Sequence, residues 1–113
     1  MGIDSYRFGE VLIDGKAFMS DVIIFPDRVR SSWWRKEGHE LALQDLEEVL
    51  AEKPEVLVVG TGASGCMRVL PETERELKRR GIELRAEPTG AACTLYNELS
   101  KKRKAVAALH LTC

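Results

Sequence analysis

Three glycines stand at the spacing of a phosphate-binding loop. Gly60, Gly62 and Gly65 follow the apolar run Val56–Val59, and glycines after a buried strand let backbone amides approach a phosphate. That fingerprint also needs a helix that begins at the last glycine, whereas the next helix signal here is Pro71. We therefore expect a structural turn or another ligand at this loop in preference to a nucleotide.

A serine nucleophile does not fit the same loop. Ser64 would need the order Gly-x-Ser-x-Gly, and the second glycine comes one residue too early, at Gly65. His39 and His110 are the two histidines that could act as bases. His110 lies in an apolar run, so we expect it to be a hydrogen-bonded core residue.

The chain has three cysteines, Cys66, Cys93 and Cys113, without a Cys-x-x-Cys pair or a Cys/His cluster. This pattern argues against a disulfide framework and a zinc site, and we expect no metal and no cofactor. Cys66 follows the glycine loop, and Cys93 falls in the first turn of an expected helix, where the macrodipole lowers a thiol pKa. Both are candidate reactive thiols; the alternative is that each is a small buried apolar residue.

The elements that would position these residues can be predicted from apolar periodicity, Pro and Gly. Asp14-Gly15 between apolar runs predicts a two-residue hairpin turn. The expected elements are the hairpin Val11–Phe18, a strand at Asp21–Phe25, an extended segment Val29–Arg35, a helix Leu43–Lys53, a strand Val56–Val59, a helix from Pro71 to Arg80, a strand Ile82–Glu87, a helix from Thr89 to Lys102 and a central strand Ala105–Leu111. Residues 1–113 are expected to form one α/β domain.

This order places one crevice at the carboxyl edge of the parallel strands, where open α/β sheets bind ligands. The glycine loop, Arg68 and the N-terminus of the Thr89 helix should meet there, with Thr89 as the helix N-cap. Free amides and a helix N-terminus favour an anion. The hypothesis is a small anionic ligand bound by Gly60, Thr61, Gly62, Gly65, Arg68, Thr89 and Gly90.

Charge and composition exclude several classes of partner. The 17 basic and 18 acidic residues nearly cancel, and the clusters at 78–80 and 101–104 close expected helices. We therefore expect no nucleic-acid and no membrane partner. No apolar run reaches the ~18 residues of a membrane span, and residues 1–7 lack a signal-peptide pattern. We expect a cytoplasmic protein.

An aromatic and basic group, Trp33, Trp34, Arg35 and His39, precedes the first long helix. In an extended segment the two tryptophans point to opposite faces. Tryptophan is enriched in interface hot spots, so the exposed member of the pair is the better candidate for contact with a protein partner.

Four motifs together resemble the Mth-domain-like family, a small domain of unknown function shared by an adipogenesis-associated animal protein and a mitochondrial complex I assembly factor. The motifs are Trp33-Trp34-Arg35 with Gly38-His39, Val58-Val59-Gly60-Thr61-Gly62, Pro88-Thr89 with Ala91-Ala92 and Tyr96-Asn97, and Arg103 with Val106–Cys113. The resemblance implies a three-layer α/β fold: a mixed five-stranded sheet with one strand antiparallel to the rest, flanked by helices, and an additional N-terminal β unit. It implies no catalytic activity, cofactor or active-site residue.

Two functions follow from these observations. The first is a cytoplasmic binding or assembly-type module, without established catalysis, that acts through the Trp33/Trp34 surface or the glycine-loop edge. The assembly factor acts by binding other proteins, which favours this function, and only about five residues precede the first expected strand, which favours the cytosol over the mitochondrion. The second is a small-molecule enzyme or anion-binding protein that uses the crevice. The oligomeric state stays open.

Overall fold

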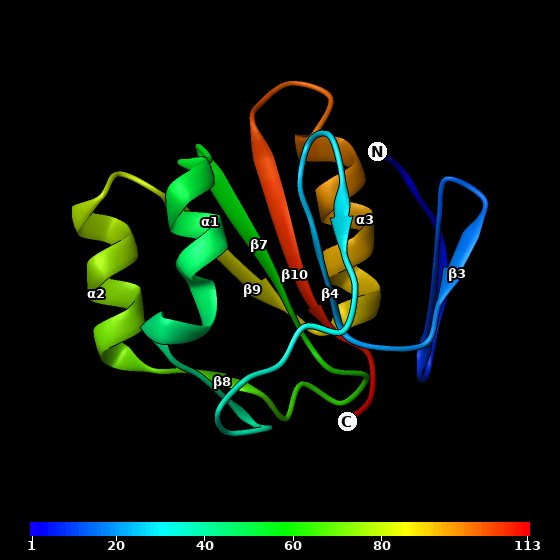
Figure 1. Cartoon of the computed structure of the whole chain (residues 1–113), viewed down its shortest axis with the longest axis horizontal. Helices are drawn as coiled ribbons and strands as arrows, with labels where there is room; N and C mark the ends of the chain where they lie inside the picture. Colours follow the sequence, from blue (N-terminus) through cyan, green and yellow to red (C-terminus); the bar gives the residue numbers. More distant parts are fainter.

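A computed structural model describes residues 1–113 as three layers (Figure 1). The middle layer is a five-stranded sheet in the order β5–β4–β10–β7–β9. Its strands are β4 (Val22–Ile24), β5 (Val29–Arg30), β7 (Val56–Thr61), β9 (Glu83–Glu87) and β10 (Ala105–His110). β4 runs antiparallel to both of its neighbours, and the other four strands share one direction. The expected mixed sheet with one antiparallel strand is confirmed.

Helices cover both faces of this sheet because its central strands are apolar on both sides. In β7, Val56 and Val58 pack with α3 (Thr89–Leu99), whereas Leu57 and Val59 pack with α1 (Glu47–Glu52) and α2 (Pro71–Arg79). Side chains alternate between faces along a strand, so a continuous apolar run indicates burial on both faces. None of these helices is long and apolar enough to span a bilayer.

The additional N-terminal β unit is a separate antiparallel sheet that packs on the α3 side. It consists of β1 (Ile3–Arg7), β2 (Glu10–Ile13) and β3 (Lys16–Phe18). The predicted hairpin turn is confirmed, with positive φ at Asp14 and Gly15. Asn97 on α3 bonds to both backbone groups of Ile3, at 2.9 and 2.8 Å, and so holds this sheet against the helix.

The expected helix Leu43–Lys53 is only partly correct. Residues Leu43–Leu46 form a 3₁₀ turn, η1, and the α-helix α1 covers only Glu47–Glu52. The Asp45 carboxylate accepts the N–H groups of Ala42 and Lys36, at 2.9 and 3.1 Å. These bonds tie the first turn to the preceding segment, which favours a tight turn over an α-helical one.

A two-stranded parallel sheet is absent from the sequence prediction. It pairs β6 (Glu40–Leu41) with β8 (Arg68–Val69). Two-residue strands carry no readable alternation, and their partners lie far apart in the sequence. This pair joins the segment after the glycine loop to the segment after the tryptophans.

The two central strands end side by side. In the parallel register of β7 and β10, Gly60 lies opposite Leu109 and Thr61 opposite His110. The glycine loop that follows β7 is therefore a direct neighbour of the end of β10. Both candidate surfaces of the molecule lie at this end of the sheet.

Candidate functional site

The glycine loop, residues Gly60–Gly65, is bonded to other parts of the chain. The amide of Gly62 donates to Thr89 Oγ1 at 2.8 Å, and the amide of Ala63 donates to the Thr112 carbonyl at 2.7 Å. The amides of Gly65, Cys66 and Met67 donate to the carbonyls of Gly62, Cys113 and Thr61. The amides of Gly62, Ala63 and Gly65 are therefore already in use within the chain.

Close packing explains two of the glycines. A Cβ atom on Gly62 would lie 2.6 Å from the carbonyl oxygen of Cys113, and Gly62 also has a φ of +108°. A Cβ atom on Gly60 would lie 2.9 Å from both Leu109 Cδ2 and Thr89 Oγ1. Contacts this short require a residue without a side chain. Packing within the chain therefore explains these two glycines, and no ligand has to be assumed.

Thr89 is not the cap of helix α3, and that prediction is wrong. Pro88 occupies the N-cap position, and no side chain caps the helix. The buried Thr89 hydroxyl instead accepts the Gly62 N–H at 2.8 Å and donates to the His110 carbonyl at 2.6 Å. It links the glycine loop to the end of β10, so it stabilises the fold at the point where an anion was expected.

Of the remaining residues of the anion hypothesis, Arg68 and Gly90 are exposed and Thr61 is buried. Arg68 lies in β8, and its guanidinium pairs with Glu40 of β6 at 3.1 Å. Its side chain makes no hydrogen bond to the glycine loop or to α3. Gly90 is exposed in the first turn of α3, and Thr61 donates its hydroxyl to the Glu87 carbonyl at 3.1 Å. The anion site stays a prediction, without the free loop amides on which it was based.

The predicted lowering of the Cys93 pKa is wrong. Cys93 lies in the core between α3 and the sheet, and burial raises the pKa of its thiol to about 12. A buried thiol of this kind is poorly nucleophilic near neutral pH. Cys66 is exposed in the segment after the glycine loop, and Cys113 is exposed as well. All three cysteines are free.

The tryptophan loop, residues Trp33–Gly38, separates its aromatic side chains as expected. Trp33 is buried, and its indole N–H donates to the Asp45 carbonyl at 3.0 Å. Trp34 points outward with 86% of its surface exposed. The predicted partner surface therefore divides into exposed residues, Trp34 and His39, and buried ones, Trp33 and Arg35.

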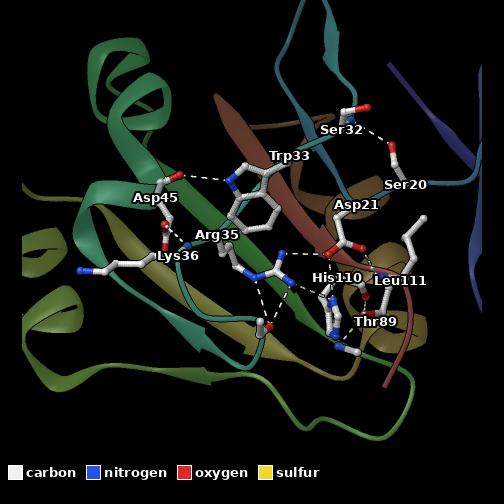
Figure 2. Close-up of polar contacts among 12 residues, drawn as sticks. Ser20, Asp21, Ser32, Trp33, Arg35, Lys36, Asp45, Thr89, His110 and Leu111 are labelled. Carbon is white, nitrogen blue, oxygen red and sulfur yellow. Dashed lines mark hydrogen bonds and ion pairs between the residues drawn. The ribbon is translucent and has the colours of Figure 1, made fainter.

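A buried polar cluster anchors this loop; we call Asp21, Arg35 and His110 the Asp21 cluster (Figure 2). Asp21 Oδ2 lies 2.9 Å from Arg35 Nη1 and 2.8 Å from His110 Nδ1. The second oxygen, Oδ1, accepts the Leu111 N–H at 2.8 Å, and the Asp21 carbonyl accepts the Trp33 N–H at 2.9 Å. One aspartate thus joins its own segment to two others, the tryptophan loop and the end of β10.

The guanidinium of Arg35 is fixed from several sides. Its Nε and Nη2 atoms donate to the Gly38 carbonyl at 3.3 and 3.0 Å, which closes the tryptophan loop on itself. Its Cζ atom lies 4.8 Å from the centre of the Trp33 ring, as in a cation–π contact. The side chain is only 5% exposed. Arg35 therefore fixes the loop that presents Trp34.

The charges of the Asp21 cluster can be assigned. Burial alone would raise the pKa of Asp21, but hydrogen bonds from His110, the Leu111 N–H and Arg35, together with the Arg35 charge, lower that pKa overall. Asp21 is therefore a carboxylate, and His110 Nδ1 carries the proton that it donates to this carboxylate. His110 Nδ1 also lies 3.0 Å from Arg35 Nη2, and His110 Nε2 is buried without a partner.

An Asp–His pair of this kind can orient a general base, but here the base is inaccessible. His110 Nε2 is covered, and the ring of His39 lies edge-on at 5.9 Å between centroids. A general base must lie within hydrogen-bond distance of its substrate. We assign the Asp21 cluster to positioning the tryptophan loop. The expectation that His110 is a hydrogen-bonded core residue is confirmed.

An open pocket of about 460 Å³ lies directly over this cluster. Its wall includes Ser20, Ser32, Trp34, Arg35 and Lys36. The sequence prediction did not include Asp21 among the site residues, because an acidic residue beside an apolar run is explained equally well as the boundary of a strand. A signal was present, because Asp21, Arg35 and His110 are ionisable residues within or beside apolar runs, where charged side chains need partners.

Comparison with known proteins agrees with this architecture. The family described as "Protein of unknown function (DUF498/DUF598)" matches residues 3–110. The chain belongs to this family. A DUF498/DUF598 domain is therefore present over nearly the whole sequence, and the resemblance to Mth-domain-like proteins is confirmed.

Three relatives illustrate the similarity. A conserved hypothetical protein of Pyrococcus horikoshii OT3, known from a crystal structure, is 35% identical, with a TM-score of 0.85 and full coverage of both chains. A Bordetella pertussis Mth938-like domain is 23% identical with a TM-score of 0.72 over 97% of this chain and 85% of that one, which shows the fold alone. The Danio rerio NADH dehydrogenase [ubiquinone] 1 alpha subcomplex assembly factor 3 is 35% identical over 86% of this chain. The chain spans only 56% to 59% of the length of the curated assembly factors that it matches.

Proposed function

We propose that this DUF498/DUF598 chain is a protein-binding module of the assembly type, and that its contact surface is centred on Trp34. The curated relatives that the chain matches are named assembly factors of NADH dehydrogenase, and an assembly factor acts by binding other proteins. This likeness supports the class of function. The choice of surface rests on the structure of the tryptophan loop.

The observation that carries the proposal is the exposure of Trp34 on an anchored loop. A tryptophan that is 86% exposed has unfavourable contact with water unless a partner covers it. Its backbone is fixed on both sides, by the Trp33 N–H bond to Asp21 and by the Arg35 bonds to Gly38. A fixed anchor loses little conformational entropy on binding, which is typical of hot-spot residues.

Two further exposed apolar side chains lie beside segments that are bonded to the Asp21 cluster or to its neighbours. Phe8 and Met19 are 65% and 72% exposed. Phe8 precedes Gly9, whose amide donates to the Leu111 carbonyl at 2.9 Å, and Met19 precedes Ser20, whose hydroxyl accepts the Ser32 N–H at 2.9 Å. Both side chains therefore lie next to segments that Asp21 holds together. Exposed apolar side chains beside these bonded segments favour a protein partner.

The second function, an enzyme or anion-binding protein with a site between the Gly60–Gly65 loop and α3, gains no support from these contacts. The amides of Gly62, Ala63 and Gly65 are bonded within the chain, and burial raises the pKa of Cys93. This function and the cytoplasmic location both stay predictions from the sequence.

Photo-crosslinking tests the proposal in the organism that makes the protein. A benzophenone amino acid replaces Trp34 in one variant and Lys102, at the other end of β10, in the control. We expect a covalent adduct with one defined protein from position 34 and none from position 102. Equal adducts from both positions, or none from position 34, would contradict a contact surface at Trp34.

A further inference from the structure

A second surface lies at the opposite edge of the central sheet. β9 is the last strand in the order β5–β4–β10–β7–β9, so only β7 pairs with it. Figure 1 shows α2 at this end of the molecule, far from the N-terminal sheet. The Asp21 cluster joins the residue before β4, the end of β10 and the tryptophan loop, so β7 separates the β9 edge from the Trp34 surface.

The outer edge of β9 offers unpaired backbone groups. Glu83 donates its N–H to the Glu55 carbonyl at 3.0 Å, which fixes the register of the parallel ladder. In such a ladder, alternate residues of a strand turn both backbone groups toward the neighbouring strand. Residues 83, 85 and 87 therefore face β7, whereas Leu84 and Ala86 direct their N–H and C=O groups outward. An extended segment could pair with these groups.

A groove of about 480 Å³ accompanies this edge, between β9 and α2. The α2 residues in its wall, Pro71, Glu74, Arg75 and Lys78, recur at helical spacing and form one stripe. The half-buried Leu84 and the buried Ile82 add apolar surface to the groove. A helix wall beside an open strand edge is the arrangement in which a peptide can be added as a further strand.

The charges of this groove favour one kind of occupant. Edge charges usually discourage strand addition, but Arg103 holds Glu83 at 2.9 Å, so this charge is already paired within the chain. The cations Arg75 and Lys78 of α2 make no ion pair. Glu74 is the single unpaired acid beside them, and the wall therefore carries an excess of positive charge.

We propose that the β9 edge binds an extended, acidic segment of a partner protein, which adds as a strand between β9 and α2. The segment's backbone pairs with Leu84 and Ala86. Its acidic side chains point to Arg75 and Lys78, and its apolar side chains cover Leu84. This site is independent of Trp34 and gives the protein a second contact for an assembly partner.

A displayed library of random octapeptides tests this site. Selection against the wild-type chain is expected to enrich sequences that alternate acidic and apolar residues. The selected peptides are then measured on the double variant Arg75→Glu/Lys78→Glu, with Lys101→Glu/Lys102→Glu as the control of equal charge change. We expect binding to weaken about tenfold or more in the first variant only.

A backbone variant separates strand addition from simple charge attraction. Ala86→Pro removes one outward N–H without touching the bonds to β7, and Ala86→Val keeps this N–H. The selected peptides should bind the valine variant and lose binding to the proline variant, and Trp34→Ala should leave their binding unchanged. The proposal is overturned if no sequence is enriched over the Ala86→Pro chain, or if the peptides bind all these variants equally.

Discussion

The glycine loop and the tryptophan loop lie at the same end of the central sheet but differ in what fixes them. The glycine loop is held by close packing, since a Cβ on Gly62 would meet the Cys113 carbonyl at 2.6 Å. The tryptophan loop is held by buried charges, through the ion pair of Asp21 and Arg35 at 2.9 Å. The loop with the spacing of a phosphate-binding loop uses its amides within the chain, whereas the tryptophan loop presents an exposed aromatic side chain.

This difference shows that close packing alone, without a ligand, can account for a glycine motif. Gly60 and Gly62 satisfy a steric requirement of the packing between β7, α3 and the segment after β10. A phosphate loop has the same residue pattern for another reason, the approach of a ligand. The two cases differ in whether the backbone amides of the loop are free for a ligand or bonded within the chain. This difference cannot be read from the sequence.

The largest predicted effect on stability is at the Asp21 cluster, which holds the tryptophan loop through buried charges. Asp21→Ala leaves Arg35 and His110 without their partner inside the protein, and it should lower the free energy of unfolding by about 3–5 kcal/mol. Urea unfolding followed by tryptophan fluorescence measures this change. The double variant Asp21→Leu/Arg35→Met removes both charges and should recover most of the loss. A cost below about 1 kcal/mol for Asp21→Ala would mean that the ion pair does not hold the loop.

The next effect tests the packing of the glycine loop. Gly62→Ala adds a methyl group against the Cys113 carbonyl at a φ of +108° and should cost about 2–4 kcal/mol in unfolding experiments. Gly65→Ala is the matched control, because Gly65 also has a positive φ but its Cβ would meet nothing closer than 3.6 Å. The control should cost about 1 kcal/mol. Equal costs would refute the role of close packing at Gly62.

A smaller effect is expected where the two regions meet. Thr89→Val removes the hydroxyl that bonds both the Gly62 N–H and the His110 carbonyl, and it should cost about 1–3 kcal/mol. Thr89→Ser keeps this hydroxyl and should stay closer to the wild-type stability. If serine and valine destabilise equally, the hydroxyl does not link the glycine loop to β10.

The pH dependence of stability sharpens the assignment of charge. The pKa of Asp21 lies below its ordinary value of 3.8, so its contribution is fully present above that value. The contribution is lost as the pH falls through the lowered pKa of the folded state. The stability difference between the wild type and Asp21→Asn should therefore be constant near neutral pH and shrink below 3.8. A difference that does not change with pH would contradict an ionised Asp21.

Local patterns predicted most elements of this fold. The Asp14-Gly15 hairpin, the fully buried strands β7 and β10 and the edge strand β9 follow from turn chemistry, apolar runs and alternation, all of which lie within a few neighbouring residues. The Asp21 cluster could not be predicted in this way. Its members come from β10, the tryptophan loop and the residue before β4, so only tertiary folding brings them together.

The pairing of β6 with β8 and the role of Thr89 were missed for related reasons. A two-residue strand has no period, and a threonine after proline at a helix start is usually a cap. The three-layer arrangement and the single antiparallel strand were predicted from the family resemblance. Only the three-dimensional structure shows that Trp34, and not Trp33, is the exposed tryptophan.

The central claim is that partners bind at the tryptophan loop and not at the glycine loop. Its most direct test is the amount of native partner that co-purifies with wild type, Trp34→Ala and Ser64→Glu. Ser64 is exposed at the tip of the glycine loop, and its replacement by glutamate repels an anion there. We predict that Trp34→Ala loses the partner while Ser64→Glu retains it. Loss in Ser64→Glu with full retention in Trp34→Ala would contradict this account.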